Sequence, residues 1–298
     1  MKNQSVPFAA KLSLISACLL WAASFIATKT ALNTVPPLTV VVIRLMVSSA
    51  CFIVWLMVKK KKIPYLGPKW MGQMFLLSLF GTGLHYSIQT IGITYTTASN
   101  ASLYAATGPI CITIIAAFFL RERITLKKAL GIGCAFLGVL IVQGFGVLKA
   151  FDLRGHLMGD VLVFVSIFMW GLFTVLGKDM MQRMDAFDLT AVATFMGSIY
   201  MLPISWYELR NRSFSFSSIS GEAWGAIAFL GVTCSFLATI LYFFALEKAE
   251  SQKVGVYLYT IPPMSYVIAA LVLHESIGAG LLIGSLVVLT GVYITERG

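Results

Sequence analysis

Residues 109–124 read PICITIIAAFFLRERI, and residues 262–277 read PPMSYVIAALVLHESI. The two stretches share a first proline, a glutamate near the end and a final isoleucine, each pair 153 positions apart. Two glycine pairs continue the same spacing: Gly131 with Gly284, and Gly138 with Gly291. Five identities at one spacing are hard to obtain by chance, so we infer that the chain contains an internal repeat.

The sequence around the repeat has the composition of a membrane protein. Of its 298 residues, 58% are apolar and 11% charged, and the mean hydropathy is +0.87. Soluble domains carry about 25% charged residues. A helix needs about 20 apolar residues to cross roughly 30 Å of hydrocarbon. Ten runs approach that length, near 10–30, 38–58, 70–93, 99–120, 126–147, 157–177, 188–207, 222–245, 254–273 and 278–295.

The repeat divides these runs into two sets of five, in residues 1–148 and 149–298. Five is odd, so the second copy must enter the membrane from the opposite side. The loops agree, because residues 121–128 carry four basic side chains and the equivalent residues 274–280 carry no Lys or Arg. We therefore predict an all-α integral membrane protein of ten transmembrane helices, built as two inverted five-helix repeats. This is the usual architecture of secondary transporters, whose site lies near the midplane between the repeats.

The basic residues predict the orientation of the chain. With the N-terminus inside, sixteen of the 22 Lys and Arg residues flank the spans on the inner side and five on the outer side, and Arg44 lies within a span. Cytoplasmic loops carry such an excess. We expect a multi-pass protein of the cytoplasmic membrane with both termini cytoplasmic. The net charge of +10 is thus a topology signal and not a sign of nucleic-acid binding.

The chain resembles the EamA family of the drug/metabolite transporter superfamily. The resemblance rests on residues 20–25 (LWAASF), Arg44-Leu45, residues 98–103 (ASNASL) leading to Pro109, and residues 120–125 (LRERIT). It implies a ten-helix carrier that exports small metabolites, often amino acids, or drugs by alternating access. It also implies a central cavity lined by the third, fourth, eighth and ninth helices and their neighbours.

Ionisable groups within a span are functional candidates, because a charge there costs roughly 2.5–3.5 kcal/mol on insertion scales. Arg44 has two functional readings: it attracts a substrate carboxylate, or it holds a hydrogen-bond network at the cavity rim. It also has two structural ones: it reaches the outer headgroups, or it pairs with backbone carbonyls. His85 shares a helix face with Gln89, while Tyr86 is expected to point elsewhere. His85 has three open readings: a cavity-lining group, a proton-coupling group, or a neutral imidazole bonded to a neighbouring helix.

Aromatic and proline residues give a second group of candidates. Trp21 matches Trp170, and Lys29 matches Lys178, each 149 positions later in the chain. Either the tryptophans line the pocket from equivalent positions, or these residues serve only for packing and anchoring. Two prolines at equivalent positions of the repeats are expected to interrupt their helices, each removing a backbone hydrogen bond and straining the preceding turn. Such breaks mark a binding site or gate, or they are ordinary kinks fitted by packing. The further cavity candidates are Tyr104, Tyr242 and Tyr257, and the candidate breaks are Pro109 and Pro262. Glu122 and Glu275 precede the next helix, where a carboxylate favours the helix dipole, and are read as structural.

These features predict a secondary active transporter that exports small metabolites such as amino acids. The alternatives are a multidrug efflux carrier and an uncoupled facilitator or channel. An enzyme is not expected, because no span holds two carboxylates and the histidines are scattered. We expect no metal and no cofactor, and the partners to be a small-molecule substrate and the lipid bilayer. Whether the chain is a monomer or a homodimer stays open, as do its substrate and coupling ion.

Overall fold

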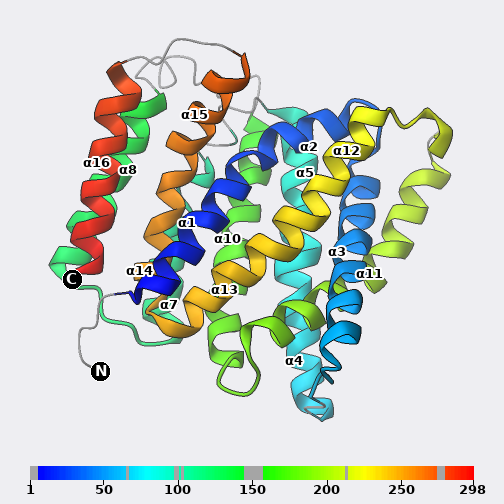
Figure 1. Cartoon of the computed structure of the whole chain (residues 1–298), viewed down its shortest axis with the longest axis horizontal. Coiled ribbons are helices and arrows are strands. Elements are labelled where there is room, and N and C mark those ends of the chain that lie inside the picture. Colours follow the sequence, from blue (N-terminus) through cyan, green and yellow to red (C-terminus); the bar gives the residue numbers. More distant parts are fainter. Residues whose placement is uncertain are drawn as a thin grey trace.

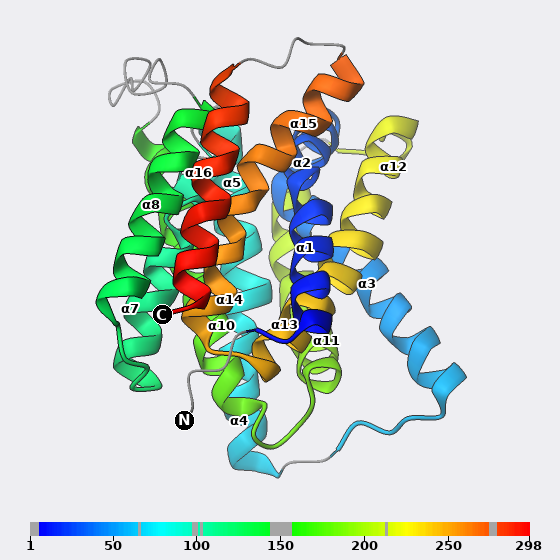
Figure 2. The same cartoon turned by 60° about the vertical axis from the view of Figure 1, so that its left-hand side comes forward.

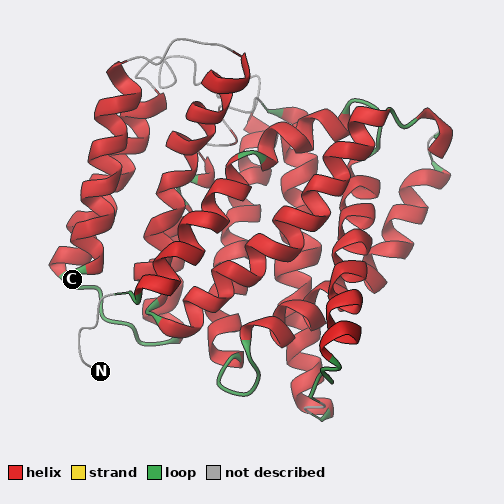
Figure 3. Cartoon of the chain, viewed as in Figure 1, coloured by secondary structure: helices red, strands yellow, loops and turns green. Residues whose placement is uncertain are grey.

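The structure is a computed structural model that describes residues 6–64, 67–96, 101, 104–143, 157–211, 214–273 and 279–298. All regular elements in these residues are helices (Figure 3). They follow one another in ten rods, some of them built from consecutive segments.

The first half of the chain supplies five rods. They are α1–α2 (Phe8–Ala22, Ser24–Leu32), α3 (Pro37–Lys59), α4–η1–α5 (Pro68–Ser78, Leu79–Leu84, His85–Tyr95), α7 (Gly108–Phe119) and α8 (Leu126–Gln143). The second half supplies the other five. They are α10 (Leu157–Met180), α11 (Ala186–Arg210), α12–η3–α13 (Gly221–Phe229, Leu230–Ala238, Thr239–Lys248), α14–η4–α15 (Ser251–Gly255, Val256–Thr260, Ile261–Leu273) and α16 (Ala279–Glu296).

Each rod coincides with one of the expected apolar runs. Residues 99–100, 102–103, 144–147 and 278 of those runs lie outside the described residues. By length and apolarity alone, six helices of the described chain can cross a membrane, namely residues 8–32, 37–59, 157–180, 186–210, 221–248 and 279–296. The chain is therefore a multi-pass, all-helical membrane protein.

The helices run up and down between two faces of the molecule (Figures 1 and 2). We call the face at which α1 begins and α16 ends the terminal face; it is the lower edge of Figure 1. Helix α1 runs away from this face, whereas α10 runs toward it. Helix α8 likewise runs away from it and α16 toward it. Thus helices that match one another in the sequence run in opposite directions.

Local sequence signals account for the helix ends. Pro37 and Pro68 occupy first positions of α3 and α4, where a missing N–H costs nothing. Pro109 lies at the second position of α7 and Pro262 at the second position of α15. Both prolines therefore begin an α-helix and remove no hydrogen bond from a helix interior, contrary to the expectation of a strained interior turn. The helical path does break before each of them, at a turn before Pro109 and at the 3₁₀ segment η4 before Pro262.

Glycines of the repeat bring α8 and α16 into close contact (Figure 1). A Cβ on Gly131 would overlap Thr295 and the Gly291 carbonyl, and a Cβ on Gly138 would overlap the backbone of α16. The reverse holds for Gly284 and Gly291 against α8. Small residues let helix backbones approach within a membrane, where packing rather than hydrophobicity holds helices together. The four repeat glycines therefore pair the last helices of the two halves.

We predict that Gly131→Ala lowers the stability of the detergent-solubilised protein by about 1–3 kcal/mol, because the added methyl group must push α16 away. Gly133 provides the matched control, since a Cβ there meets nothing within 4 Å. Gly133→Ala should be neutral or slightly stabilising, because alanine favours a helix. Thermal unfolding followed by tryptophan fluorescence checks both; equal melting temperatures would contradict the close contact.

Candidate functional site

Two rods change from α-helix to the wider π-helix in mid-course, η1 at Leu79–Leu84 and η3 at Leu230–Ala238. The repeat spacing maps residues 79–84 onto 232–237, inside η3. Such wide turns are rare and frequently adjoin functional sites. The two flank a cavity: His85 follows η1 directly, and the Cys234 carbonyl of η3 accepts a hydrogen bond from Trp21 Nε1 at 3.3 Å.

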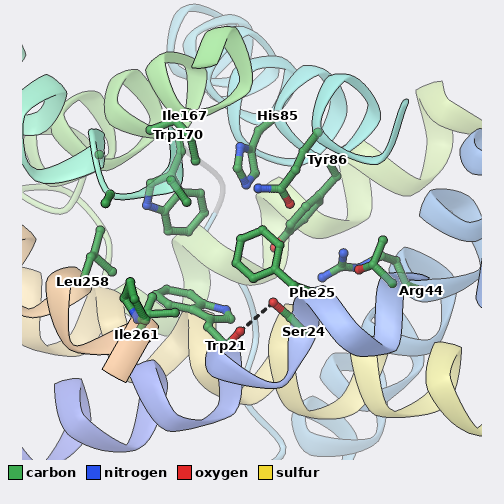
Figure 4. A pocket seen from close by; sticks show the side chains of 16 residues that line it. Trp21, Ser24, Phe25, Arg44, His85, Tyr86, Ile167, Trp170, Leu258 and Ile261 are labelled. Carbon is green, nitrogen blue, oxygen red and sulfur yellow. Dashed lines mark hydrogen bonds between the residues drawn. The ribbon is translucent and has the colours of Figure 1, made fainter. Parts of the chain in front are cut away.

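A cavity of about 90 Å³ lies where α1 meets α2 and η4 meets α15, and Figure 4 shows the side chains that line it. Its polar lining residues are Ser24, Thr28, Arg44, His85, Tyr86 and Gln89. Its larger apolar lining residues are Trp21, Phe25, Ile167, Trp170, Leu258, Ile261 and Pro262. A single water needs roughly 10–15 Å³ of such space, so the cavity suits a small molecule. Both halves of the chain contribute to its wall.

Arg44 is the one charged residue among the described residues that line the cavity. Its Nε donates to Ser235 Oγ at 2.9 Å, and its guanidinium carbon lies 4.2 Å from the centre of the Tyr86 ring. The side chain is 4% exposed, and no ion pair of the described chain includes it. The snorkelling expected as one alternative is therefore not seen. Arg44 is instead held in place by Ser235 of η3 and by the Tyr86 ring.

The π segment η3 explains how Arg44 is held. A Cβ on Gly231 would overlap Val47 and the Arg44 carbonyl, so the glycine lets η3 approach α3 closely. Ser235, one turn further along η3, is thereby brought within hydrogen-bond distance of the guanidinium.

His85 is buried and hydrogen-bonded to a neighbouring helix. Its Nδ1 lies 2.8 Å from the Ser166 carbonyl of α10, and a carbonyl can only accept. Nδ1 therefore carries the hydrogen, and in the neutral ring Nε2 is left as an acceptor. The ring packs against Trp170 at 5.2 Å and Tyr86 at 5.0 Å between centroids. Of the three readings of His85, this geometry agrees with the bonded, cavity-lining imidazole; a part in proton coupling stays a prediction.

Three aromatic rings close the cavity toward the terminal face. Trp21 and Trp170 meet edge to face at 5.4 Å, and Tyr242 lies 5.3 Å from Trp21 and 5.7 Å from Trp170. Offset and edge-to-face pairs are the favoured arrangements of such rings. Tyr242 and its neighbour Phe243 are fully buried, and every residue of α14 and η4 is buried. The half of the molecule between the cavity and the terminal face is therefore packed.

Several predicted site residues do not line the cavity. Tyr242 supports the two tryptophans from below, and Tyr257 donates a hydrogen bond to Glu296 near the terminal face. Tyr104 packs with Phe25 and Ile167 to one side. Pro109 is buried in α7, whereas Pro262 does line the cavity.

The rod of η3 and α13, the eighth, also contributes no lining residue, although the family resemblance implied that it would. Trp21 and Trp170 stand between Tyr242 of α13 and the cavity, which accounts for the difference.

The structure also brings in residues that sequence reasoning placed elsewhere or left out. Tyr86 was expected to point away from the site, yet it lines the cavity under Arg44. Adjacent helix positions are about 100° apart, so the side chains of His85 and Tyr86 can both reach a cavity that lies between their two directions. Phe25, which the sequence places on one helical stripe with Trp21 and Lys29, also lines the cavity. Ser235 carried no signal, because its role depends on the approach of η3.

Ion pairs join the two halves at the terminal face. Lys178 Nζ donates to Glu122 Oε1 at 3.1 Å, and Lys128 Nζ to Glu250 Oε2 at 2.5 Å. Lys11 pairs with Glu296 at 2.5 Å. Burial alone would raise the pKa of the Glu250 carboxyl, but the hydrogen bond and charge of Lys128 outweigh burial and hold this pKa below its usual range. Every ion pair within the described residues lies at this face.

Comparisons with known proteins agree with this arrangement. The model of the EamA-like transporter family matches twice, over residues 9–143 and 157–297. An uncharacterized transporter of Archaeoglobus fulgidus is 30% identical over 277 residues and covers 93% of each chain. The uncharacterized transporter YoaV of Bacillus subtilis is 24% identical over 95% of each chain. A solved crystal structure with 17% identity superposes with a TM-score of 0.79 over 96% of each chain, which shows the same fold. The chain is therefore a membrane transporter, not an enzyme, and belongs to the EamA-like transporter family of the drug/metabolite transporter superfamily.

Proposed function

We propose that this transporter is a secondary active carrier that exports small metabolites, in particular amino acids, by alternating access. It would do so between two inverted repeats of five transmembrane helices, residues 1–148 and 149–298. The observation that carries the proposal is the small cavity lined by both halves of the chain. Toward the terminal face, side-chain packing and ion pairs close it.

The inverted repeat is supported by pairs of features that recur at the repeat spacing. The Thr107 hydroxyl donates to the Tyr104 carbonyl at 2.6 Å, and the Thr260 hydroxyl to the Tyr257 carbonyl at 2.7 Å. The π segments and the interlocked glycines of α8 and α16 recur in the same way. Because matching helices run in opposite directions, we infer that the copies are related by an axis in the membrane plane.

Alternating access requires that one side of the site be closed while the other is free to open. Here the closed side is the terminal face, which the Lys and Arg distribution assigns to the cytoplasm together with both termini. At this face, ion pairs join the first half of the chain to the second, rather than a covalent link or one continuous helix. Such contacts can separate and re-form as the halves move.

An α-amino acid fits the chemistry of the cavity. Arg44 offers a charged, forked donor for the carboxylate. The free Nε2 of the His85 ring and the Gln89 amide offer acceptors for the ammonium group. Trp21, Phe25 and Trp170 supply an apolar wall for a side chain. Efflux of cationic drugs is less well supported, because Arg44 would repel a cation and the described lining residues include no carboxylate.

A reconstitution experiment tests the substrate class. Purified protein in liposomes is offered a panel of labelled amino acids and a panel of cationic dyes. We expect saturable, stereoselective uptake of one or a few amino acids, and counterflow when the unlabelled compound is loaded inside. Movement of the dyes alone would contradict amino-acid transport, and uptake that neither saturates nor shows counterflow would indicate a channel.

Arg44→Lys tests the carboxylate contact within the same assay. Lysine keeps the charge but loses the forked donor, the hydrogen bond to Ser235 and the stacking on Tyr86. We expect KM for the transported amino acid to rise about tenfold or more, since charge-assisted hydrogen bonds contribute about 1.5–3 kcal/mol. Arg183→Lys is the matched control, because Arg183 stacks on Trp70 at 3.5 Å, outside the cavity. Equal KM values for the two variants would remove Arg44 from substrate binding.

A further inference from the structure

Glu122 joins the two halves of the chain through hydrogen bonds that all cross from one half to the other. It lies in the loop between α7 and α8, yet its carboxylate accepts from the backbone N–H of Ser251 at 2.9 Å and of Gln252 at 3.3 Å. It also accepts from Lys178 Nζ. Sequence analysis read Glu122 as stabilising the helix that follows it; the helix start that it actually stabilises is that of α14, in the other half.

Lys178 closes this set of contacts. Its Nζ also donates to the carbonyl of Ala249 at 2.5 Å, just before α14 begins. We call the set formed by Glu122, Lys178, Ala249 and the start of α14 the α14 latch. The side chains of Glu122 and Lys178 are only 10% and 21% exposed, so water weakens their attraction little.

The rod that the latch holds is also a wall of the cavity. It continues from α14 through η4, where Leu258 lines the cavity, into α15, where Ile261 and Pro262 do. A shift at the start of α14 is therefore transmitted along one rod to the cavity wall. The 3₁₀ segment η4 lies between the start of α14 and Pro262, and it interrupts the regular α-helical bonding of the rod.

Behind the latch, buried polar atoms have no protein partner among the described residues. They are both amide atoms of Gln252, the hydroxyls of Ser251 and Tyr259, and the Thr113 hydroxyl on α7. Gln252 is fully buried. Most buried polar groups in native structures are hydrogen-bonded, so unpaired ones call for an explanation. A surface that is buried in one state and wet in the other explains why polar groups are retained where α14 and η4 adjoin α7.

We propose that Glu122 is the positioning residue of the inner gate: the α14 latch holds shut a polar path along Gln252, and its release opens the cavity to the terminal face. This rests on the proposed alternating-access function and adds the residue that controls one of its two states. Glu122 does not touch the substrate in this scheme. It acts through α14, so its loss shifts the balance between states rather than removing a binding contact.

Labelling of a single cysteine tests the gate without any need for a known substrate. The five native cysteines are replaced, and Ala105→Cys places one thiol in the cavity wall. A membrane-impermeant maleimide is then applied to the full-length protein in vesicles, from either side. Glu122→Gln should raise the labelling rate from the terminal face about tenfold or more, because the variant loses the charge-assisted hydrogen bonds that hold α14. Labelling from the opposite face should fall in the same variant, which local unfolding would not cause.

Two further variants complete the design. Lys178→Met breaks the same latch but removes a positive charge instead of a negative one. If the latch controls access, both variants should shift the labelling rate in the same direction. If the charge acts only on the reagent, the two variants should shift the rate in opposite directions. Asp179→Asn is the matched control, because within the described part of the chain this exposed carboxylate at the same face bonds only to Gln182 of its own turn. It should leave both rates unchanged.

Failure of this inference is distinguishable from failure of the proposed function. If labelling from the terminal face is the same in wild type, Glu122→Gln and Lys178→Met, measured on the monodisperse fraction of each, Glu122 is not the gate, even where liposomes transport amino acids. An equal rise in Asp179→Asn overturns it as well. Conversely, a latch-dependent change in labelling supports the gate even if no amino acid is transported in the substrate panel.

Discussion

A polar group in hydrocarbon has no water to bond with, and the structure depends on how the chain meets that constraint. All regular secondary structure in the described residues is helical, so backbone groups within the spans bond to one another. Within the spans, Arg44 bonds to Ser235 and stacks on Tyr86, and His85 bonds to a carbonyl of α10. Ion pairs gather at the terminal face, where the hydrocarbon ends. Polar side chains are thus tolerated where hydrogen bonds, stacking or ion pairs hold them in place.

The two halves of the chain meet in two physically different ways. Helices α8 and α16 interlock through glycines whose close approach leaves no room for an added methyl group, so this pair is suited to act as a fixed support. Around the cavity, by contrast, the rods contain π or 3₁₀ segments, and the contacts that close the terminal face are hydrogen bonds and charges. Irregular backbone and ionic contacts can exchange partners, whereas interlocked backbones cannot. This division places the moving parts of the proposed cycle beside the cavity.

Membership of the family establishes that the chain is a transporter. The relatives from Archaeoglobus fulgidus and Bacillus subtilis are named only as uncharacterized transporters, so the argument for the substrate rests on the cavity. One buried cation, a histidine acceptor, an amide and an aromatic wall form a small asymmetric site. Arg44 has no counterpart in the second repeat, where the matching stretch is residues 191–195 (AVATF). The symmetry that builds the carrier therefore does not extend to the group that would select its substrate.

The sequence by itself determined the class of protein, the positions of the helices, the repeat and most of the charged and aromatic candidates, because hydrophobic length, loop charge and a fixed spacing are properties of the chain alone. Only the tertiary structure decided which candidates meet. Trp21, Arg44, His85, Gln89 and Trp170 converge on one cavity, whereas Tyr104, Tyr242 and Tyr257 do not line it. Glu122 stabilises α14 rather than the helix that follows it, because the start of α14 packs against the end of α7 at the terminal face. Such pairings depend on how closely separate helices approach, and glycines such as Gly231 set that distance between residues nearly two hundred positions apart in the chain.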